Sequence, residues 1–159
     1  MGWLDYHLHL FRIRNPTTGR IDEIGIPNDD LSFNDRPCRA GWETPITEYF
    51  AKPTDRADYG YDLGDDWQHI VTLEAITELQ QGKVGLVCLA GERACPPEDC
   101  GGIPGYEHLL QAIDDLTHPE HAAMMEWVGD DFDPERFAPE RVKFDDPRER
   151  WKGSFENAT

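Results

Sequence analysis

The sequence predicts an α+β fold, with an antiparallel or mixed sheet in the N-terminal half and helices in the C-terminal half that pack on it. Alternation of apolar and polar residues, the pattern of half-buried strands, dominates the first half of the chain. Apolar residues three and four apart, the pattern of helices, come later, and this segregation favours α+β over α/β. The length of 159 residues fits a single domain.

Five segments read as strands. Leu4–Ile13 alternates and is followed by a Pro/Thr/Gly turn and a shorter strand at Ile21–Ile26, which predicts a hairpin. A second pair, Tyr59–Leu63 and Trp67–Ile76, is joined by Gly-Asp-Asp, a turn-forming trio. Val84–Cys88 is a further brief strand.

Helix signals are clearest after the loop of residues 88–102. Tyr106, Leu109 and Ile113 recur at helical spacing. Pro119 predicts the start of the next helix and Gly129 its end.

Two short helices are expected elsewhere, and the segment between the first two strand pairs is expected to be a loop. Thr44 and Pro45 predict an N-cap and a first helical position, and Asp133-Pro134 begins a last short helix. Pro27–Gly41 has no period and reads as a loop. Trp67 and Trp127 are expected to anchor the core.

Fifteen basic residues against 32 acidic ones give a net charge of −17. A surface this acidic disfavours direct binding to nucleic acid or anionic membranes. No apolar run approaches the ~20 residues of a membrane span, and the N-terminus lacks signal-peptide features. The sequence therefore predicts a cytoplasmic protein with reduced thiols, a domain over residues 1–144 and a flexible charged tail over 145–159.

The loop Cys88–Gly102, CLAGERACPPEDCGG, holds three cysteines among prolines and glycines. Zinc prefers a tetrahedron of thiolates and imidazoles, and such loops close tightly around it. The predicted ligands of a structural zinc ion are Cys88, Cys95, Cys100 and His69. Other sources of the fourth ligand are His118, His121 and Cys38. Two alternatives to a metal site are a disulfide and thiols that pack as small apolar groups.

A catalytic metal site is the alternative to a structural one. Asp65 or Asp66 would serve as base, with His118 or His121 as ligands. The chain has no HExxH, GxSxG or P-loop motif. His7 and His9 alternate on a strand and are interpreted as half-buried packing residues.

Three stretches resemble the plasmid pRiA4b ORF-3-like family, some members of which are found with mobile elements. They are YGYDLGDDWQHIVTLE (Tyr59–Glu74), CLAGERACPPEDCGGIPGYEHLL (Cys88–Leu110) and HPEHAAMMEWVGDDFDPERF (His118–Phe137). The similarity runs in order from about Trp3 to Phe144, and Leu63 replaces the usual Phe. The resemblance implies an α+β fold and little about activity.

In that family the segment that matches MGWLDYHLHLF follows a strand pair and a helix. The resemblance thus implies that these N-terminal elements are missing here and that a sheet edge is exposed. An open edge pairs readily with another chain, which predicts self-association or an unknown protein partner. The resolvase label given to some relatives is unsupported, because Ser32 and Ser154 have no arginine cluster near them. The sequence thus predicts an acidic interaction domain with a structural metal, or else a metal-dependent hydrolase.

Overall fold

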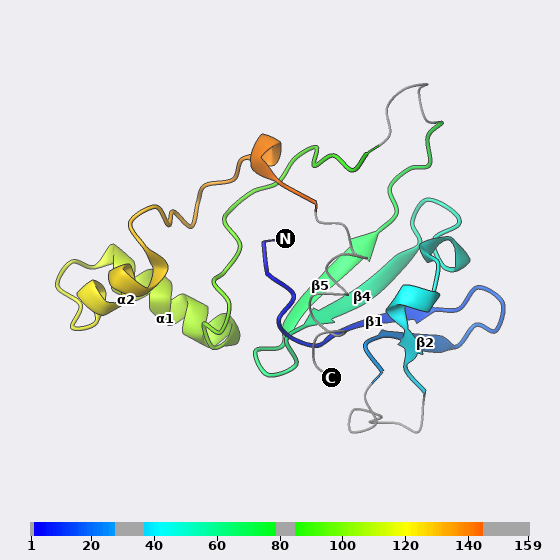
Figure 1. Ribbon diagram of the computed structural model, residues 1–159, viewed down its shortest axis with the longest axis horizontal. Helices are drawn as coiled ribbons and strands as arrows, with labels where there is room; N and C mark the ends of the chain where they lie inside the picture. The colour runs from blue at the N-terminus through cyan, green and yellow to red at the C-terminus, as the bar shows by residue number, and fades with distance from the viewer. Residues whose placement is uncertain (1, 28–36, 79–84, 145–159) are drawn as a thin grey trace, which may run out of the picture. The chain divides into compact units, whose positions relative to one another are not determined.

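The computed structural model describes residues 2–27, 37–78 and 85–144 (Figure 1). The chain divides into two compact units. One comprises Met1–Glu78 with Cys95–Phe132, and the other comprises Leu79–Ala94 with Asp133–Thr159. The first unit contains the sheet and both α-helices, so the predicted α+β class is confirmed.

A five-stranded mixed sheet occupies the N-terminal half. Its strands are β1 (His9–Arg14), β2 (Ile21–Gly25), β3 (Arg39–Ala40), β4 (Arg56–Tyr61) and β5 (Trp67–Thr72). The order is β3-β2-β1-β4-β5, and only the β2–β3 pair is parallel. Both predicted hairpins are confirmed, whereas β3 was expected to be loop.

The first strand begins five residues later than predicted. Asp5 has a φ of 61°, in the left-handed region, which breaks the extended run. Residues 2–8 therefore leave the sheet and pack against another loop of the same unit. The strand predicted at Val84–Cys88 is wrong for its described part, because residues 85–88 have no regular structure.

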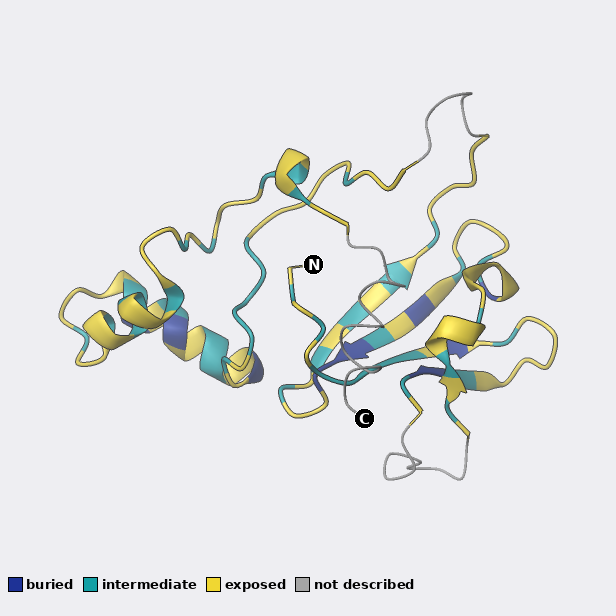
Figure 2. Ribbon diagram, viewed as in Figure 1, coloured by how far each residue is buried: buried dark blue, intermediate teal, exposed yellow. Residues whose placement is uncertain are grey.

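The sheet core is small and lies around β1, β2 and β4 (Figure 2). Its buried residues are Ile13, Ile24, Tyr49 and Ala57, with Phe11 and Phe50 packed against them. Large aromatic side chains supply much of the buried area in so small a core.

Tyr49 enters this core from the chain between β3 and β4. Thr44 does not cap a helix as predicted, and the segment forms short 3-10 turns, η2 (Gly41–Glu43) and η3 (Ile46–Glu48). The Tyr49 hydroxyl donates to Asp22 Oδ2 at 2.6 Å. Hydrogen bonds from Asn15 and Tyr49 lower the pKa of Asp22.

The helices α1 (Gly102–Asp114) and α2 (His121–Val128) pack against each other. The spacing correctly predicted α1 and the stop of α2 at Gly129, while α2 begins two residues after Pro119. Leu109 and Ala112 are fully buried on α1. Trp127 is 49% exposed, so its predicted place in the core is wrong. No helix among the described residues is long and apolar enough to cross a membrane.

The second unit is mostly irregular. No helix begins at Asp133-Pro134, where a turn replaces it; the described helical turn is η4 (Pro139–Arg141). Ala94 N donates to Pro134 O at 2.9 Å. The tail predicted at residues 145–159 lies outside the described residues.

Candidate metal site

The N-terminal segment, residues 2–8, lies along the loop of residues 95–100. Trp3 Nε1 donates to Pro96 O at 2.9 Å, and Leu4 N donates to Glu98 Oε1 at 2.6 Å. At Gly2 an added Cβ would lie 2.8 Å from Cys95 Cβ, so the backbone approaches closely there. These contacts join segments more than 90 residues apart and bring His7 beside the loop.

His7 faces three carboxylates, and we call these four residues the His7 cluster. Its Nε2 lies 3.1 Å from Asp99 Oδ1, 3.6 Å from Asp62 Oδ2 and 3.9 Å from Glu98 Oε2. The nitrogen is buried and forms no hydrogen bond of acceptable geometry with any described residue. A buried polar atom without a hydrogen bond is uncommon and calls for a physical explanation.

Asp62 is held in a fixed orientation by backbone amides. The residue is 7% exposed, and its Oδ1 accepts hydrogen bonds from Gly64 N at 2.9 Å and Asp65 N at 3.2 Å. Its own amide donates to Leu8 O at 3.0 Å. Oδ1 is therefore satisfied, and Oδ2 is left facing His7, which is how outer contacts orient a ligating carboxylate.

Glu98 is positioned by a buried tyrosine. The Tyr61 hydroxyl lies 2.9 Å from Glu98 Oε1 and 3.1 Å from Oε2, and Tyr61 is 1% exposed. Burial, and then the Glu98 carboxylate, raise the pKa of Tyr61 far above its ordinary value. The hydroxyl thus stays protonated and donates a hydrogen bond to Glu98. The Trp3 ring stacks on Tyr61 with centroids 4.8 Å apart.

Two of the three carboxylates stand on strained backbone. Asp62 and Asp99 have φ values of 51° and 57°, in the left-handed region that side chains other than Gly, Asn and Asp rarely adopt. Strain of this kind gathers at sites where function fixes the geometry. Aspartate tolerates the conformation better than glutamate would, which fits its use at both positions.

The donor set of the His7 cluster suits a divalent cation. One imidazole and several carboxylates form the N/O environment that Mn²⁺, Fe²⁺ and Zn²⁺ accept. Three ligands would leave coordination positions for water, as catalytic rather than structural sites do.

Comparison with known proteins places the chain in a family. The sequence profile described as "Plasmid pRiA4b ORF-3-like protein" matches residues 1–141. The chain belongs to the pRiA4b ORF-3-like family.

Two proteins similar to this chain are described as uncharacterized or of unknown function. The uncharacterized protein y4hQ of Sinorhizobium fredii is 33% identical over 129 residues, which cover 81% of this chain and 62% of that protein. A crystal structure of a protein of unknown function from Methanosarcina mazei Go1 is 42% identical, with a TM-score of 0.79, over 91% of this chain and 77% of the other. The chain thus spans about three fifths of the length of its curated relative.

The three cysteines predicted to bind zinc do not all fall in the same unit. Cys95 and Cys100 belong to the first unit and Cys88 to the second. Burial raises the pKa of Cys95, and burial together with the Asp65 carboxylate raises that of Cys100 to about 11. His69 Nδ1 lies 3.2 Å from Tyr59 O.

Two described groups of three His, Cys, Asp or Glu residues bring all their ligand atoms within 4.8 Å of one another. They are His7–Asp62–Asp99 and His108–His118–Glu120. Neither includes a cysteine, so the sulfur site remains a prediction from sequence.

The residues predicted for a hydrolytic site mostly have structural roles. Asp65 Oδ2 accepts from Gly101 N at 3.1 Å and fixes the loop that precedes α1. Asp66 Oδ1 accepts a short hydrogen bond from the Gln68 side chain. His121 Nδ1 lies 2.9 Å from Ala112 O, which ties α2 to α1.

Cys38 is separate from the His7 cluster. Its thiol contacts Arg39 O at 3.7 Å, and burial raises its pKa. Of the predicted residues on the α1–α2 side, His118 alone joins a convergent group.

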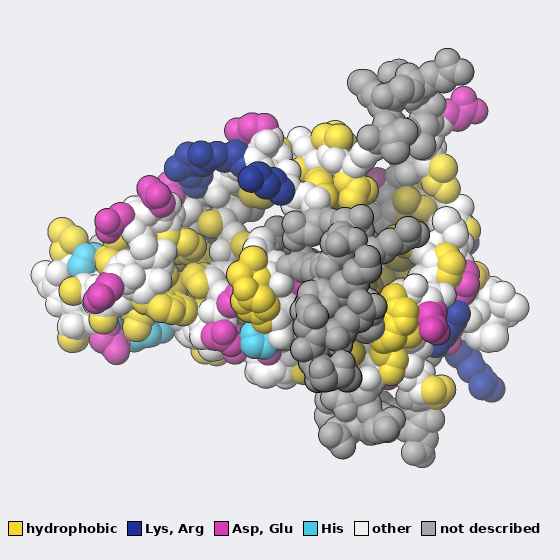
Figure 3. Space-filling model, in the orientation of Figure 1, with side chains coloured by type: hydrophobic (Ala, Val, Ile, Leu, Met, Phe, Trp, Pro, Cys, Tyr) yellow, Lys and Arg dark blue, Asp and Glu magenta, His cyan; other side chains and the backbone are white. Residues whose placement is uncertain are grey.

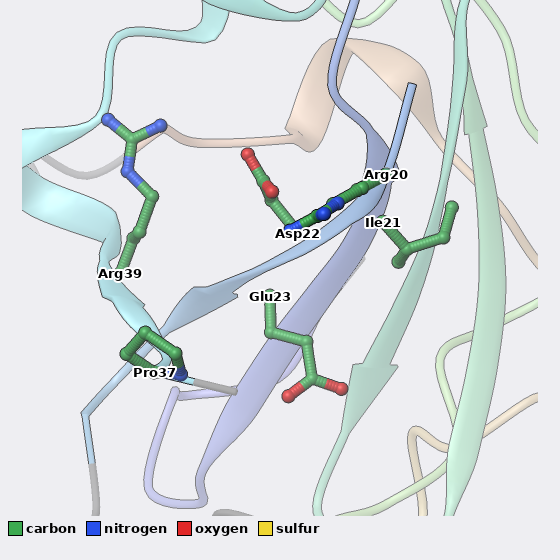
Figure 4. Close-up of a pocket in the computed structure, with 6 residues that line it drawn as sticks. All are labelled: Arg20, Ile21, Asp22, Glu23, Pro37 and Arg39. Atoms are coloured by element: carbon green, nitrogen blue, oxygen red, sulfur yellow. The ribbon is translucent and has the colours of Figure 1, made fainter. Parts of the chain in front are cut away.

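A pocket elsewhere in the first unit offers no comparable chemistry (Figure 4). Its lining residues are Arg20, Ile21, Asp22, Glu23, Pro37 and Arg39. The Arg39 guanidinium donates to Glu48 and Tyr49, and Asp22 is hydrogen-bonded to Asn15 and Tyr49. Its charges are largely paired within the protein, so it carries no site.

Sequence reasoning missed the His7 cluster although its residues stand inside the family's motifs. Glu98 and Asp99 lie between Cys95 and Cys100, and the sequence pattern predicted these two cysteines as the ligands instead. His7 alternates with apolar residues and was interpreted as part of a strand. The cluster could have been predicted from the histidine and carboxylate residues that lie near glycines in three separate segments of the sequence.

Proposed function

We propose that the chain is a metal-dependent hydrolase whose divalent ion is held by His7, Asp62 and Asp99. The observation that carries the proposal is the buried His7 Nε2, which has carboxylate oxygens 3.1 and 3.6 Å away and no hydrogen bond to a described residue. A protonated imidazole would direct its N–H at one of them. An unprotonated His7 Nε2 that coordinates a cation together with those oxygens accounts for the same geometry.

Glu98 supplies the general base in this proposal. Its Oε2 lies 3.9 Å from the ligating nitrogen, close enough to reach a metal-bound water. A bound divalent ion lowers the pKa of its water toward neutrality. Tyr61 positions Glu98 through its hydroxyl and does not itself touch the substrate.

The charge around the cluster favours a substrate that is not anionic. Among the described residues, no lysine or arginine forms an ion pair with the four cluster residues. A phosphate-rich substrate normally meets arginine or lysine in its site. Neutral esters or amides are therefore the better-suited substrate class.

Metal binding by two matched variants tests the proposal. Titration with Mn²⁺, followed by electron paramagnetic resonance, should show one ion per chain in the native protein. Asp62→Asn should weaken binding at least tenfold, while Asp66→Asn should not change it. Both replacements keep a side chain that tolerates the left-handed conformation of the original.

Activity is measured on the same proteins. Hydrolysis of p-nitrophenyl acetate should depend on Mn²⁺ and be lost in Asp62→Asn but kept in Asp66→Asn. Equal Mn²⁺ binding by both variants would refute the metal site. Binding without turnover on esters and amides would refute the hydrolase and leave a cation-binding domain.

A second candidate function is protein interaction through the edge strand β5. Within the described sheet, β5 pairs with β4 alone, and Ile70 on β5 is 62% exposed. An edge of this kind can add a strand from another copy of the chain. Light scattering after size-exclusion chromatography should show a dimer that Ile70→Lys dissociates; a clean monomer at high concentration would refute it.

A structural zinc ion on Cys88, Cys95, Cys100 and His69 remains a separate proposal. Its supporting observation is the density of thiols in one proline- and glycine-rich loop. Elemental analysis of the native protein and of Cys95→Ser tests it, because zinc content and thermal stability should fall together.

A further inference from the structure

We propose a second metal site, independent of the His7 cluster, at the turn that joins α1 to α2. Its ligands are His108, His118 and Glu120, and it takes a borderline transition-metal ion such as Zn²⁺, Ni²⁺ or Cu²⁺. The three ligand atoms already lie within 4.8 Å of one another.

The ligands come from helix α1 and from the connection that precedes α2. His108 projects from α1, and His118 and Glu120 flank Pro119 just before α2. His108 Nε2 lies 2.7 Å from Glu120 Oε2, and the His108 and His118 rings meet edge to face at 5.5 Å. Figure 3 shows histidine and acidic side chains side by side on the surface of the helical pair.

The turn is held rigid by its own hydrogen bonds. Asp115 Oδ1 accepts from Thr117 N at 2.8 Å and from Thr117 Oγ1 at 2.7 Å. His118 N donates to Asp115 O at 2.9 Å, and His121 N donates to His118 O at 3.0 Å. The ligands are therefore placed by a fixed backbone, and binding requires little ordering of the chain.

Binding an ion here displaces the interaction between His108 Nε2 and Glu120 Oε2, because the cation takes the place of the hydrogen between them. This change occurs at the surface, where a lost hydrogen bond is compensated by water.

The donor set distinguishes this site from the His7 cluster. Two imidazoles and one carboxylate select Zn²⁺, Ni²⁺ or Cu²⁺, whereas one imidazole among carboxylates accepts Mn²⁺ readily. His108 and Glu120 are exposed, so the remaining coordination positions are open to water or to a side chain of another molecule. His121 is outside this group, and its Nδ1 lies 2.9 Å from Ala112 O, a contact that ties α2 to α1.

Calorimetric titration with Ni²⁺ on the full chain tests the proposal, with Asp62→Asn as background so that the His7 cluster does not contribute. His108→Gln and His118→Asn should each weaken Ni²⁺ binding at least tenfold. Glu107→Gln removes an exposed carboxylate from the same helix outside the group and should leave it unchanged. Circular dichroism must show equal helix content in all variants, because a loss of the turn itself would mimic ligand loss.

Two results would overturn the second site. One is Ni²⁺ affinity that is unchanged in both histidine variants, and the other is an equal loss in Glu107→Gln. Neither result bears on the Mn²⁺ titration of the His7 cluster, so the two proposals fail separately.

Discussion

The hydrogen bond from Tyr61 to Glu98 allows a quantitative test of the candidate site. Tyr61→Phe removes a hydroxyl that is 2.9 and 3.1 Å from the two Glu98 oxygens and belongs to one of the most buried side chains. A hydrogen bond to a charged group contributes about 1.5–3 kcal/mol. For a chain of this length, a loss of about 2 kcal/mol lowers the melting temperature by roughly 4–8 °C.

A double-mutant cycle isolates this interaction from other effects of the replacement. Urea unfolding is followed by the fluorescence of the five tryptophans, one of which, Trp3, stacks on Tyr61. Tyr61→Phe, Glu98→Ala and the double variant should give a coupling energy of about 1.5–3 kcal/mol. The exposed Tyr6→Phe is the control and should change stability by less than about 0.5 kcal/mol. A coupling energy near zero would mean that the hydroxyl does not position Glu98.

Three further predictions concern stability. Leu109→Ala should cost about 2–5 kcal/mol in urea unfolding, whereas the exposed Leu116→Ala should cost less than about 0.5 kcal/mol; similar losses would contradict the observed burial. Gly105→Ala should destabilise by about 3 kcal/mol or more, because its Cβ would lie 1.8 Å from Cys100 O; a neutral effect on the melting temperature would show that the loop differs from the one described. Asp22 has a lowered pKa in the folded state, so its stabilisation is present above about pH 4 and lost as pH falls through the folded pKa. Asp22→Asn should therefore be less stable than the native protein at pH 7, and the difference should shrink as the pH falls below about 4, as measured by thermal unfolding; a difference that does not shrink would assign the loss to something other than charge.

The elements with a strong period were predictable from sequence. The two hairpins and α1 follow from period-2 and helical spacing, which depend on neighbours in the chain. Two-residue β3 was missed because it is set by pairing with β2, and the short helix predicted from Thr44 forms only as the 3-10 turn η3, which begins at Ile46. Such tertiary effects leave little trace in local spacing.

The candidate site was only partly predictable. The sequence directed attention to the right loop but to its sulfur atoms, because cysteine spacing is a familiar signal of metal binding. The carboxylates between them lie close to His7 because the N-terminal segment, residues 2–8, bends at Asp5 and packs along the loop of residues 95–100. The sequence alone does not show which aspartates adopt the left-handed backbone conformation.

The long sequence separation between Leu4 and Glu98 affects when the site can form. These residues are hydrogen-bonded although 94 positions apart, so closing this contact costs more chain entropy than closing a hairpin. Contacts of such long range slow folding and are absent from fragments. Neither the strands alone nor the helical pair alone contains a complete His7 cluster, so uptake of an ion there would mark the moment at which the two ends of the unit have met.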